Sequence, residues 1–175
     1  MVAALCRGKR GGRAAHRDLE KSDAKAVALF RAAAGAGLAE ALTSLGSSFF
    51  YGLGVPLDHA EAVRLYQQAA DKGHADAEAN LADAYMHGEG VAQDYAAALR
   101  FARRAADKGS ATGEANLGVL YANGWGVPRD MREAIKWYAK AAAQGIEGAI
   151  ASLRAYAADG VPEAAAALRR LRLAP

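Results

Sequence analysis

Apolar residues recur along the chain at helical spacing, and polar residues fill the positions between them. In residues 74–87 the side chains of Ala77, Leu81, Ala82 and Tyr85 follow at i, i+4, i+5 and i+8. This spacing places them on one stripe of an amphipathic helix. The pattern therefore predicts a helix here that buries one face and exposes the opposite one.

The same stripe returns at a constant interval of 36 residues, together with the segments that flank it. The aligned positions include Leu45, Leu81 and Leu117; Gly52, Gly88 and Gly124; Gly54, Gly90 and Gly126; Val55, Val91 and Val127; Asp58, Asp94 and Asp130; and Gly73, Gly109 and Gly145. Periods of 20–50 residues indicate stacked units of a few elements each. We therefore expect an array in which each unit consists of two antiparallel helices.

The Gly-x-Gly-Val segment between the two helices is a turn. Its glycines end the first helix, because glycine adopts positive φ without a steric penalty. The aspartate that follows suits the N-cap of the second helix. Glu61 and Glu133 stand three residues after such an aspartate, as in a capping box, whereas Ala97 breaks this pattern. A phosphate-binding loop needs a preceding strand and a nearby lysine, and the sequence "ANLGVLYANGWGVPRD" offers neither.

The unit resembles the Sel-one-like repeat family, a branch of the tetratricopeptide-like helical repeats. The third unit carries the resemblance most fully, at Leu117, Gly118, Tyr121, Gly124, Gly126, Val127, Asp130, Ala134, Trp137, Tyr138, Lys140, Ala141, Ala142 and Gly145. The first two units replace Trp–Tyr by Leu65–Tyr66 and Phe101–Ala102. The resemblance implies an all-α, right-handed α-solenoid of helix-turn-helix repeats. It also implies a non-enzymatic scaffold or adaptor that binds a protein or peptide.

The register divides the chain into two parts. Residues 1–20 form a basic arm, which we expect to be disordered, and residues 21–175 form the solenoid. The solenoid comprises a half repeat at 22–37, full repeats at 38–73, 74–109 and 110–145, and a degenerate repeat at 146–175. Terminal units with one neighbour are expected to depart from the consensus.

The net charge of +3 is too small to imply nucleic acid, but the charge is unevenly distributed. Residues 1–17 contain five cations and no acid. Their sequence lacks interleaved aromatic residues, so we expect neither nucleic acid nor a membrane as its partner. No apolar run is long enough for a membrane span. As written, the chain is expected to be a cytoplasmic monomer; a start further upstream would make it periplasmic or secreted.

The sequence predicts no catalytic, metal-binding or cofactor-binding site. His16, His59, His74 and His87 share no metal-ligand spacing. The stretch "SDAK" fits the S-x-x-K of serine acylases, but Ser22 falls where a helix N-cap belongs. Some cysteine-rich members of the family are described as secreted β-lactamases, and this hydrolase activity is the alternative function. Their paired cysteines are missing here, because Cys6 is the single cysteine.

The predicted binding surface is the face of each first helix that lies opposite the apolar stripe. At 100° per residue, this face comprises Ser44, Ser47 and Tyr51; Asn80, Asp83 and His87; and Asn116, Val119 and Asn123. In tetratricopeptide-like arrays this face lines the concave groove. Asn80 and Asn116 either pair with the backbone of a bound peptide or brace adjacent first helices. Trp125, between two loop glycines, either packs on a helix or contacts a partner.

Overall fold

The structure, a computed structural model, describes the backbone of residues 13–173 and the side chains of residues 22–173. Within residues 13–173 it contains nine helices and no strand. They are α1 (Arg13–Gly35), α2 (Ala39–Tyr51), α3 (His59–Asp71), α4 (Ala75–His87), α5 (Tyr95–Asp107), α6 (Ala111–Asn123), α7 (Met131–Ala143), α8 (Glu147–Ala158) and α9 (Pro162–Arg170). The predicted all-α solenoid is confirmed.

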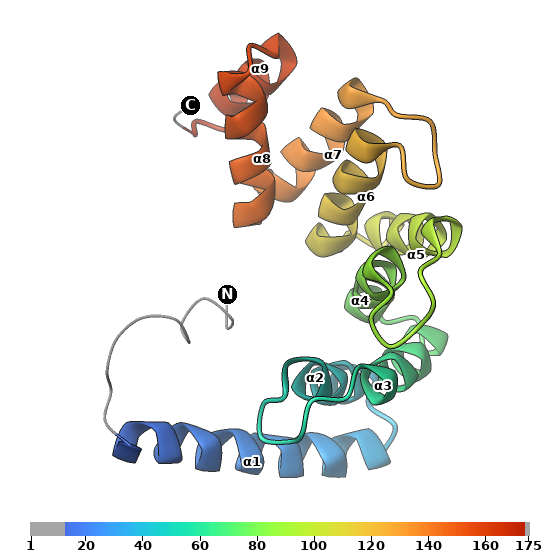
Figure 1. Cartoon of the computed structure of the whole chain (residues 1–175), viewed down its shortest axis with the longest axis vertical. Coiled ribbons are helices and arrows are strands. Elements are labelled where there is room, and N and C mark those ends of the chain that lie inside the picture. Colours follow the sequence, from blue (N-terminus) through green and yellow to red (C-terminus); the bar gives the residue numbers. More distant parts are fainter. Residues whose placement is uncertain (1–12, 174–175) are drawn as a thin grey trace.

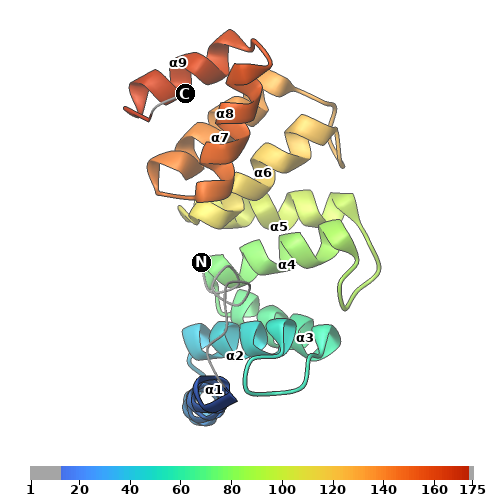
Figure 2. The same cartoon turned by 60° about the vertical axis from the view of Figure 1, so that its left-hand side comes forward.

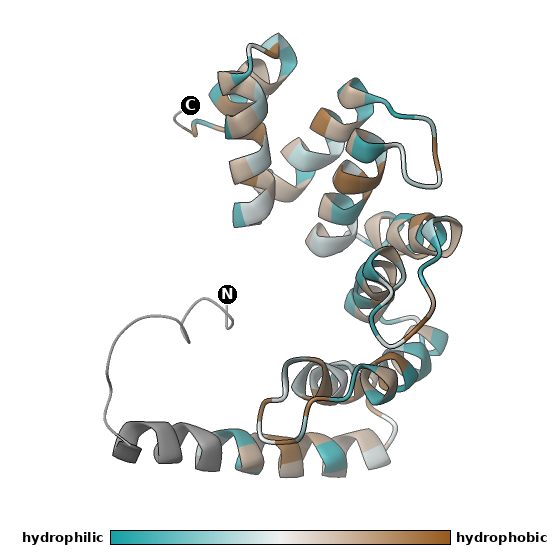
Figure 3. Cartoon of the chain, in the orientation of Figure 1, coloured by the Kyte–Doolittle hydropathy of each residue, from teal (hydrophilic) through white to brown (hydrophobic). Residues whose placement is uncertain are grey.

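The helix pairs stack into a crescent. Along the stack, α2 with α3, α4 with α5 and α6 with α7 follow one another as successive layers (Figure 2). In Figure 1, α2 and α4 lie on the inner side of the curve and α3 and α5 on the outer side. Hydrophobic and hydrophilic positions alternate along each helix (Figure 3). Since the apolar stripes of α2 and α4 face their partner helices, the opposite stripes face the inside of the crescent.

The helix ends follow the sequence prediction. Gly52, Gly88 and Gly124 adopt the left-handed conformation directly after α2, α4 and α6. At the other side of the loop, the carboxylates of Asp58, Asp94 and Asp130 accept backbone N–H groups at the starts of α3, α5 and α7. These contacts are local, which is why a short sequence motif specifies them.

The capping box is only half formed, which corrects the sequence prediction. Asp58 accepts the N–H of Glu61 at 3.0 Å, but the Glu61 carboxylate binds Arg64. It does not reach back to Asp58, because the Asp58 N–H already donates to the Phe49 carbonyl. Glu133 repeats this arrangement with the next cation along its helix.

The first helix is longer than the repeat register requires. α1 begins at Arg13 and passes through Ser22, so the expected N-cap at Ser22 is not formed. Residues 13–20, which we assigned to the basic arm, are helical here. The remainder of the predicted arm, residues 1–12, lies outside the described residues.

A buried cluster of charges joins the two helices of the middle unit and was not expected from the sequence. Glu78 of α4 is 0% exposed and lies 2.5 Å from Arg104 and 2.9 Å from Lys108. The Lys108 ammonium also donates to the carbonyl of Gly73 in the preceding unit. Burying a carboxylate is costly unless it is paired, so the two cations compensate the burial of Glu78 within its unit, and Lys108 also links this unit to the preceding one. The aligned Leu42 shows that the position tolerates an apolar side chain.

Candidate peptide-binding surface

The surface of interest, called the inner face below, is the inward stripe of the three first helices. It comprises Glu40, Ser44, Ser47 and Tyr51 of α2; Asp76, Asn80, Asp83 and His87 of α4; and Thr112, Asn116, Val119 and Asn123 of α6. These residues are half-buried or exposed, except Asn116, which is 8% exposed. The predicted residues thus lie on the stripes of α2, α4 and α6 that are opposite the apolar ones.

Several polar groups of this face are already used within the array. The Asn116 amide donates to the carbonyl of Ala79 on α4 at 2.9 Å, and so braces two adjacent first helices. Asn123 and Ser44 bond carbonyls one turn back in their own helices. Each of these side chains therefore uses one donor inside the array.

Asn80 differs from Asn116 although the two positions align. Among residues 22–173 the Asn80 side chain has no hydrogen-bond partner, and it is half-buried. The carbonyl that it would reach, by analogy with Asn116, belongs to Thr43, and this carbonyl accepts the hydroxyl of Ser47 at 3.1 Å. Asn80 therefore presents a donor and an acceptor to the inner face.

A mixed aromatic and acidic patch lies where α2 and α4 end. We call the group Tyr51, Asp83, His87 and Glu89 the Tyr51–Asp83 patch. Tyr51 is 58% exposed. Burial raises the pKa of Tyr51, and the nearby carboxylates of Asp83 and Glu89 raise it further. His87 Nδ1 lies 3.0 Å from the backbone oxygen of Asp83 and 3.3 Å from its carboxylate.

Charge is segregated between the two kinds of helix. The helices α2, α4 and α6 contain five carboxylates and no lysine or arginine. The helices α3, α5 and α7 contain seven lysines and arginines. Away from the inner face, the carboxylates of Glu61, Glu78, Glu133 and Glu163 each contact a lysine or arginine.

The carboxylates of the inner face are not balanced in this way. Glu40, Asp76 and Asp83, together with Glu89 in the following loop, have no lysine or arginine partner within the part of the chain whose side chains are described. Asp76 accepts the hydroxyl of Ser110 at 2.9 Å, and Asp83 has His87. The inner face is therefore an acidic surface on a chain with a net positive charge.

The partial burial of Asp83 has a consequence for pH dependence. Burial, and to a lesser extent Glu89, raise the pKa of Asp83 above its ordinary 3.8, while His87 opposes the shift. Between the two values the folded chain binds more protons than the unfolded chain, so stability falls as pH rises through this window and is level above it. The carboxylate is thus retained at some cost to stability.

We expect Asp83→Asn to remove this loss of stability at higher pH. As the pH increases from about 3.5 to 7, the melting temperature of the variant should rise relative to that of the wild type. Only the wild type has a half-buried carboxyl group at residue 83 that must lose its proton in this range. Circular dichroism melts at several pH values measure the difference. Asp107→Asn, which removes an exposed carboxylate on α5, is the matched control. Parallel stability–pH curves for Asp83→Asn and wild type would contradict the expectation.

Trp125 packs against the preceding unit. Its ring stacks on Tyr95, the first residue of α5, with ring centres 4.9 Å apart and planes 15° apart. The indole is half-buried. This contact explains why a tryptophan is accommodated in the loop, and it leaves part of the ring exposed.

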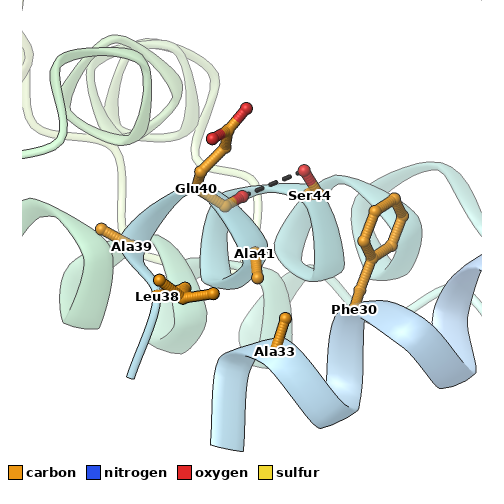
Figure 4. Close-up of a pocket in the computed structure, with 7 residues that line it drawn as sticks. All are labelled: Phe30, Ala33, Leu38, Ala39, Glu40, Ala41 and Ser44. Carbon is orange, nitrogen blue, oxygen red and sulfur yellow. Dashed lines mark hydrogen bonds between the residues drawn. The ribbon is translucent and has the colours of Figure 1, made fainter. Parts of the chain in front are cut away.

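An open hollow lies between α1 and α2. Its lining comprises Phe30, Ala33, Leu38, Ala39, Glu40, Ala41 and Ser44 (Figure 4), and its volume is about 290 Å³. The Ser44 hydroxyl is turned to the Glu40 carbonyl, and the remaining lining is mostly apolar. Ligand pockets are usually larger and present convergent polar groups, so the hollow does not resemble a small-molecule site.

The described residues contain no candidate metal-binding cluster. Among them, no group of three or more histidine, cysteine, aspartate or glutamate side chains lies close enough to hold a metal ion. His59 stacks on Phe50, and His74 bonds the Thr43 hydroxyl at 2.9 Å. Cys6 and the side chain of His16 lie outside the described residues. Within the described part, no helix is both long and apolar enough to span a membrane.

Comparison with known proteins supports the fold. The Sel1 repeat family matches residues 12–38, 39–74, 75–110 and 111–146. A solved structure of a protective antigen present in uropathogenic Escherichia coli strains, described as displaying an SLR fold, is 41% identical with a TM-score of 0.65 over 71% of this chain. A Sel1 repeat protein from Oxalobacter formigenes is 29% identical with a TM-score of 0.71 over 86% of this chain.

The chain spans 27% of the length of the first of these proteins and 64% of the second. No curated protein matches the sequence. The matched repeats begin one residue after those expected from the 36-residue register. The match to the half repeat begins at residue 12, close to the start of α1.

Proposed function

This chain is a member of the Sel1 repeat family, and we propose that it is a non-enzymatic scaffold that binds a peptide segment of a partner protein on its inner face. Repeats of this family typically serve as protein-interaction modules. The observation that carries the proposal is the inner face itself, where the free amide of Asn80 lies among exposed polar, aromatic and acidic side chains.

The chemistry of the inner face suits an extended peptide. The Asn80 amide supplies one donor and one acceptor to a peptide backbone, whatever the side chains of that peptide. Tyr51 supplies a rigid amphipathic surface of the kind enriched in binding sites. Asn116 braces two adjacent first helices, and we do not propose that it contacts the peptide directly.

The alternative function is hydrolysis, as in the cysteine-rich members of the family. It requires a nucleophile next to a base. Ser22, the only serine that suggested such a site, is an exposed residue within α1. A nitrocefin turnover assay tests this alternative directly, and turnover would overturn the scaffold proposal.

The proposal is tested by separating binding from stability. We expect Tyr51→Ala with Asn80→Ala to reduce peptide capture from a displayed peptide library at least tenfold, while the melting temperature stays within a few degrees of wild type. Both side chains are partly exposed, and truncating such residues usually changes stability little. Gln68→Ala with Asp107→Ala, two exposed residues of α3 and α5, is the matched control. Equal capture by the two double variants would refute binding on the inner face.

A second comparison separates the two roles considered for the asparagines. Asn116→Ala should lower the melting temperature, because it leaves the Ala79 carbonyl without its donor. Asn80→Ala should leave the melting temperature nearly unchanged and reduce peptide capture. The reverse result would show that Asn80 is the structural residue of the pair.

A further inference from the structure

We propose that residues 1–12 of this chain bind its own inner face at the Tyr51–Asp83 patch, and that they compete there with a peptide partner. The competition rests on the proposed function, whereas the contact between the segment and the patch does not. Three features support the contact: the opposite charges of residues 1–12 and the patch, the exposed ring of Tyr51, and the length of the segment.

The charges of the segment and the patch are complementary. Residues 1–12 contain Arg7, Lys9 and Arg10 and no aspartate or glutamate. The patch contains the carboxylates of Asp83 and Glu89, neither of which has a lysine or arginine partner in the part of the chain with described side chains. Elsewhere in this protein, exposed carboxylates such as Glu61 and Glu133 do contact a cation. The patch thus lacks the counter-charge that Glu61 and Glu133 have.

Tyr51 makes the patch suited to arginine in particular. Its ring is 58% exposed and lies close enough to Asp83 and Glu89 for both carboxylates to raise the pKa of its hydroxyl. A guanidinium can stack on an aromatic ring and at the same time donate hydrogen bonds from its edge to a carboxylate. Arg7 and Arg10 supply two such groups within four residues.

The segment starts at the correct end of the array. A Cβ atom on Gly54, just after α2, would lie 2.5 Å from the backbone of Asp23, so this part of α1 packs beside the end of α2. α1 begins ten residues earlier, at Arg13, and therefore overhangs the end of α2 by about 15 Å. In Figure 1 the start of α1 lies on the open side of the crescent.

The length of the segment is sufficient for contact. Twelve extended residues span at most about 40 Å, which exceeds the overhang of α1. Single ion pairs at an exposed surface are weak, but a short tether provides an effective concentration in the millimolar range. Three weak contacts can therefore keep the segment on the patch for much of the time, and a tighter-binding partner can displace it.

The single cysteine of the chain, Cys6, allows a direct test because it lies within the segment. A nitroxide spin label on Cys6 broadens the NMR signals of backbone amides near it. In the full chain we expect selective broadening at residues 51, 83, 87 and 89. Raising the salt concentration to about 0.5 M should largely remove it, since the Debye length falls to a few ångströms.

Charge variants make the test specific. Arg7→Gln with Lys9→Gln and Arg10→Gln should abolish the broadening, as should Asp83→Asn with Glu89→Gln. The matched control, Glu61→Gln with Glu133→Gln, removes two carboxylates outside the inner face and should preserve it. Broadening that is absent, that is equal over all faces, or that survives both inner-face and segment variants would overturn the proposal.

Two further outcomes are distinguishable. If an unlabelled, ¹⁵N-enriched chain mixed with a spin-labelled ¹⁴N chain shows the same broadening, the segment binds a second copy, and binding within one chain is refuted. A basic peptide of the sequence of residues 6–13, added to the segment variant, should produce shifts at residues 51 and 83. Failure of peptide capture in the library experiment, with selective broadening intact, would refute the proposed function and leave this contact standing.

Discussion

Replacing Gly90 with alanine is expected to lower the free energy of unfolding by about 2–4 kcal/mol, from backbone strain and a steric clash together. Gly90 has φ of +74°, and a Cβ atom there would lie 2.2 Å from the carbonyl oxygen of His59 in the preceding unit. The clash is with backbone at the start of α3, which cannot rotate away. Chemical denaturation monitored by circular dichroism measures the change.

Gly109 provides the matched control. It has φ of +82°, but a Cβ atom there would meet nothing within 4 Å. Gly109→Ala therefore carries the cost of positive φ alone, about 1 kcal/mol. If both variants lost the same stability, the close approach of the loop to His59 would not contribute. If Gly90→Ala were neutral, the loop would not have the conformation described here.

Gly118→Ala is expected to destabilise the wild-type protein and to stabilise a Tyr138→Ala background. A Cβ atom on Gly118 would lie 2.6 Å from the ring of Tyr138, so the ring must move, at a cost of about 1–3 kcal/mol. When the ring is absent, the new methyl group enters the cavity, and alanine is the better helix former by about 1 kcal/mol. The sign of the effect should therefore reverse.

The middle unit of the wild-type chain already has alanine at both of these positions. In the middle unit the positions aligned with Gly118 and Tyr138 are Ala82 and Ala102, and both are 0% exposed. Urea unfolding of the wild type, the two single variants and the double variant gives the coupling energy between Gly118 and Tyr138. Additive effects would show that the glycine is not required for the tyrosine.

The sequence by itself determined the period, the helix bounds and the caps. These features depend on contacts within a few residues, such as the Asp94 carboxylate with the N–H groups that follow it. Helical periodicity also fixed which stripe lies opposite Leu81 and Tyr85. The sequence did not predict the course of α1 through Ser22, since the N-cap propensity of serine does not prevent a helix from continuing.

Only the tertiary structure decided how the residues of the inner face are used. Asn80 and Asn116 are the same residue at aligned positions, yet Asn116 is bonded to Ala79, whereas Asn80 has no hydrogen-bond partner among the side chains of residues 22–173. In the helix beside Asn80 the equivalent carbonyl, of Thr43, accepts the hydroxyl of Ser47 instead. Contacts within and between the helices therefore decide which donors and acceptors remain available to a partner, because each hydrogen bond made inside the array uses one of them.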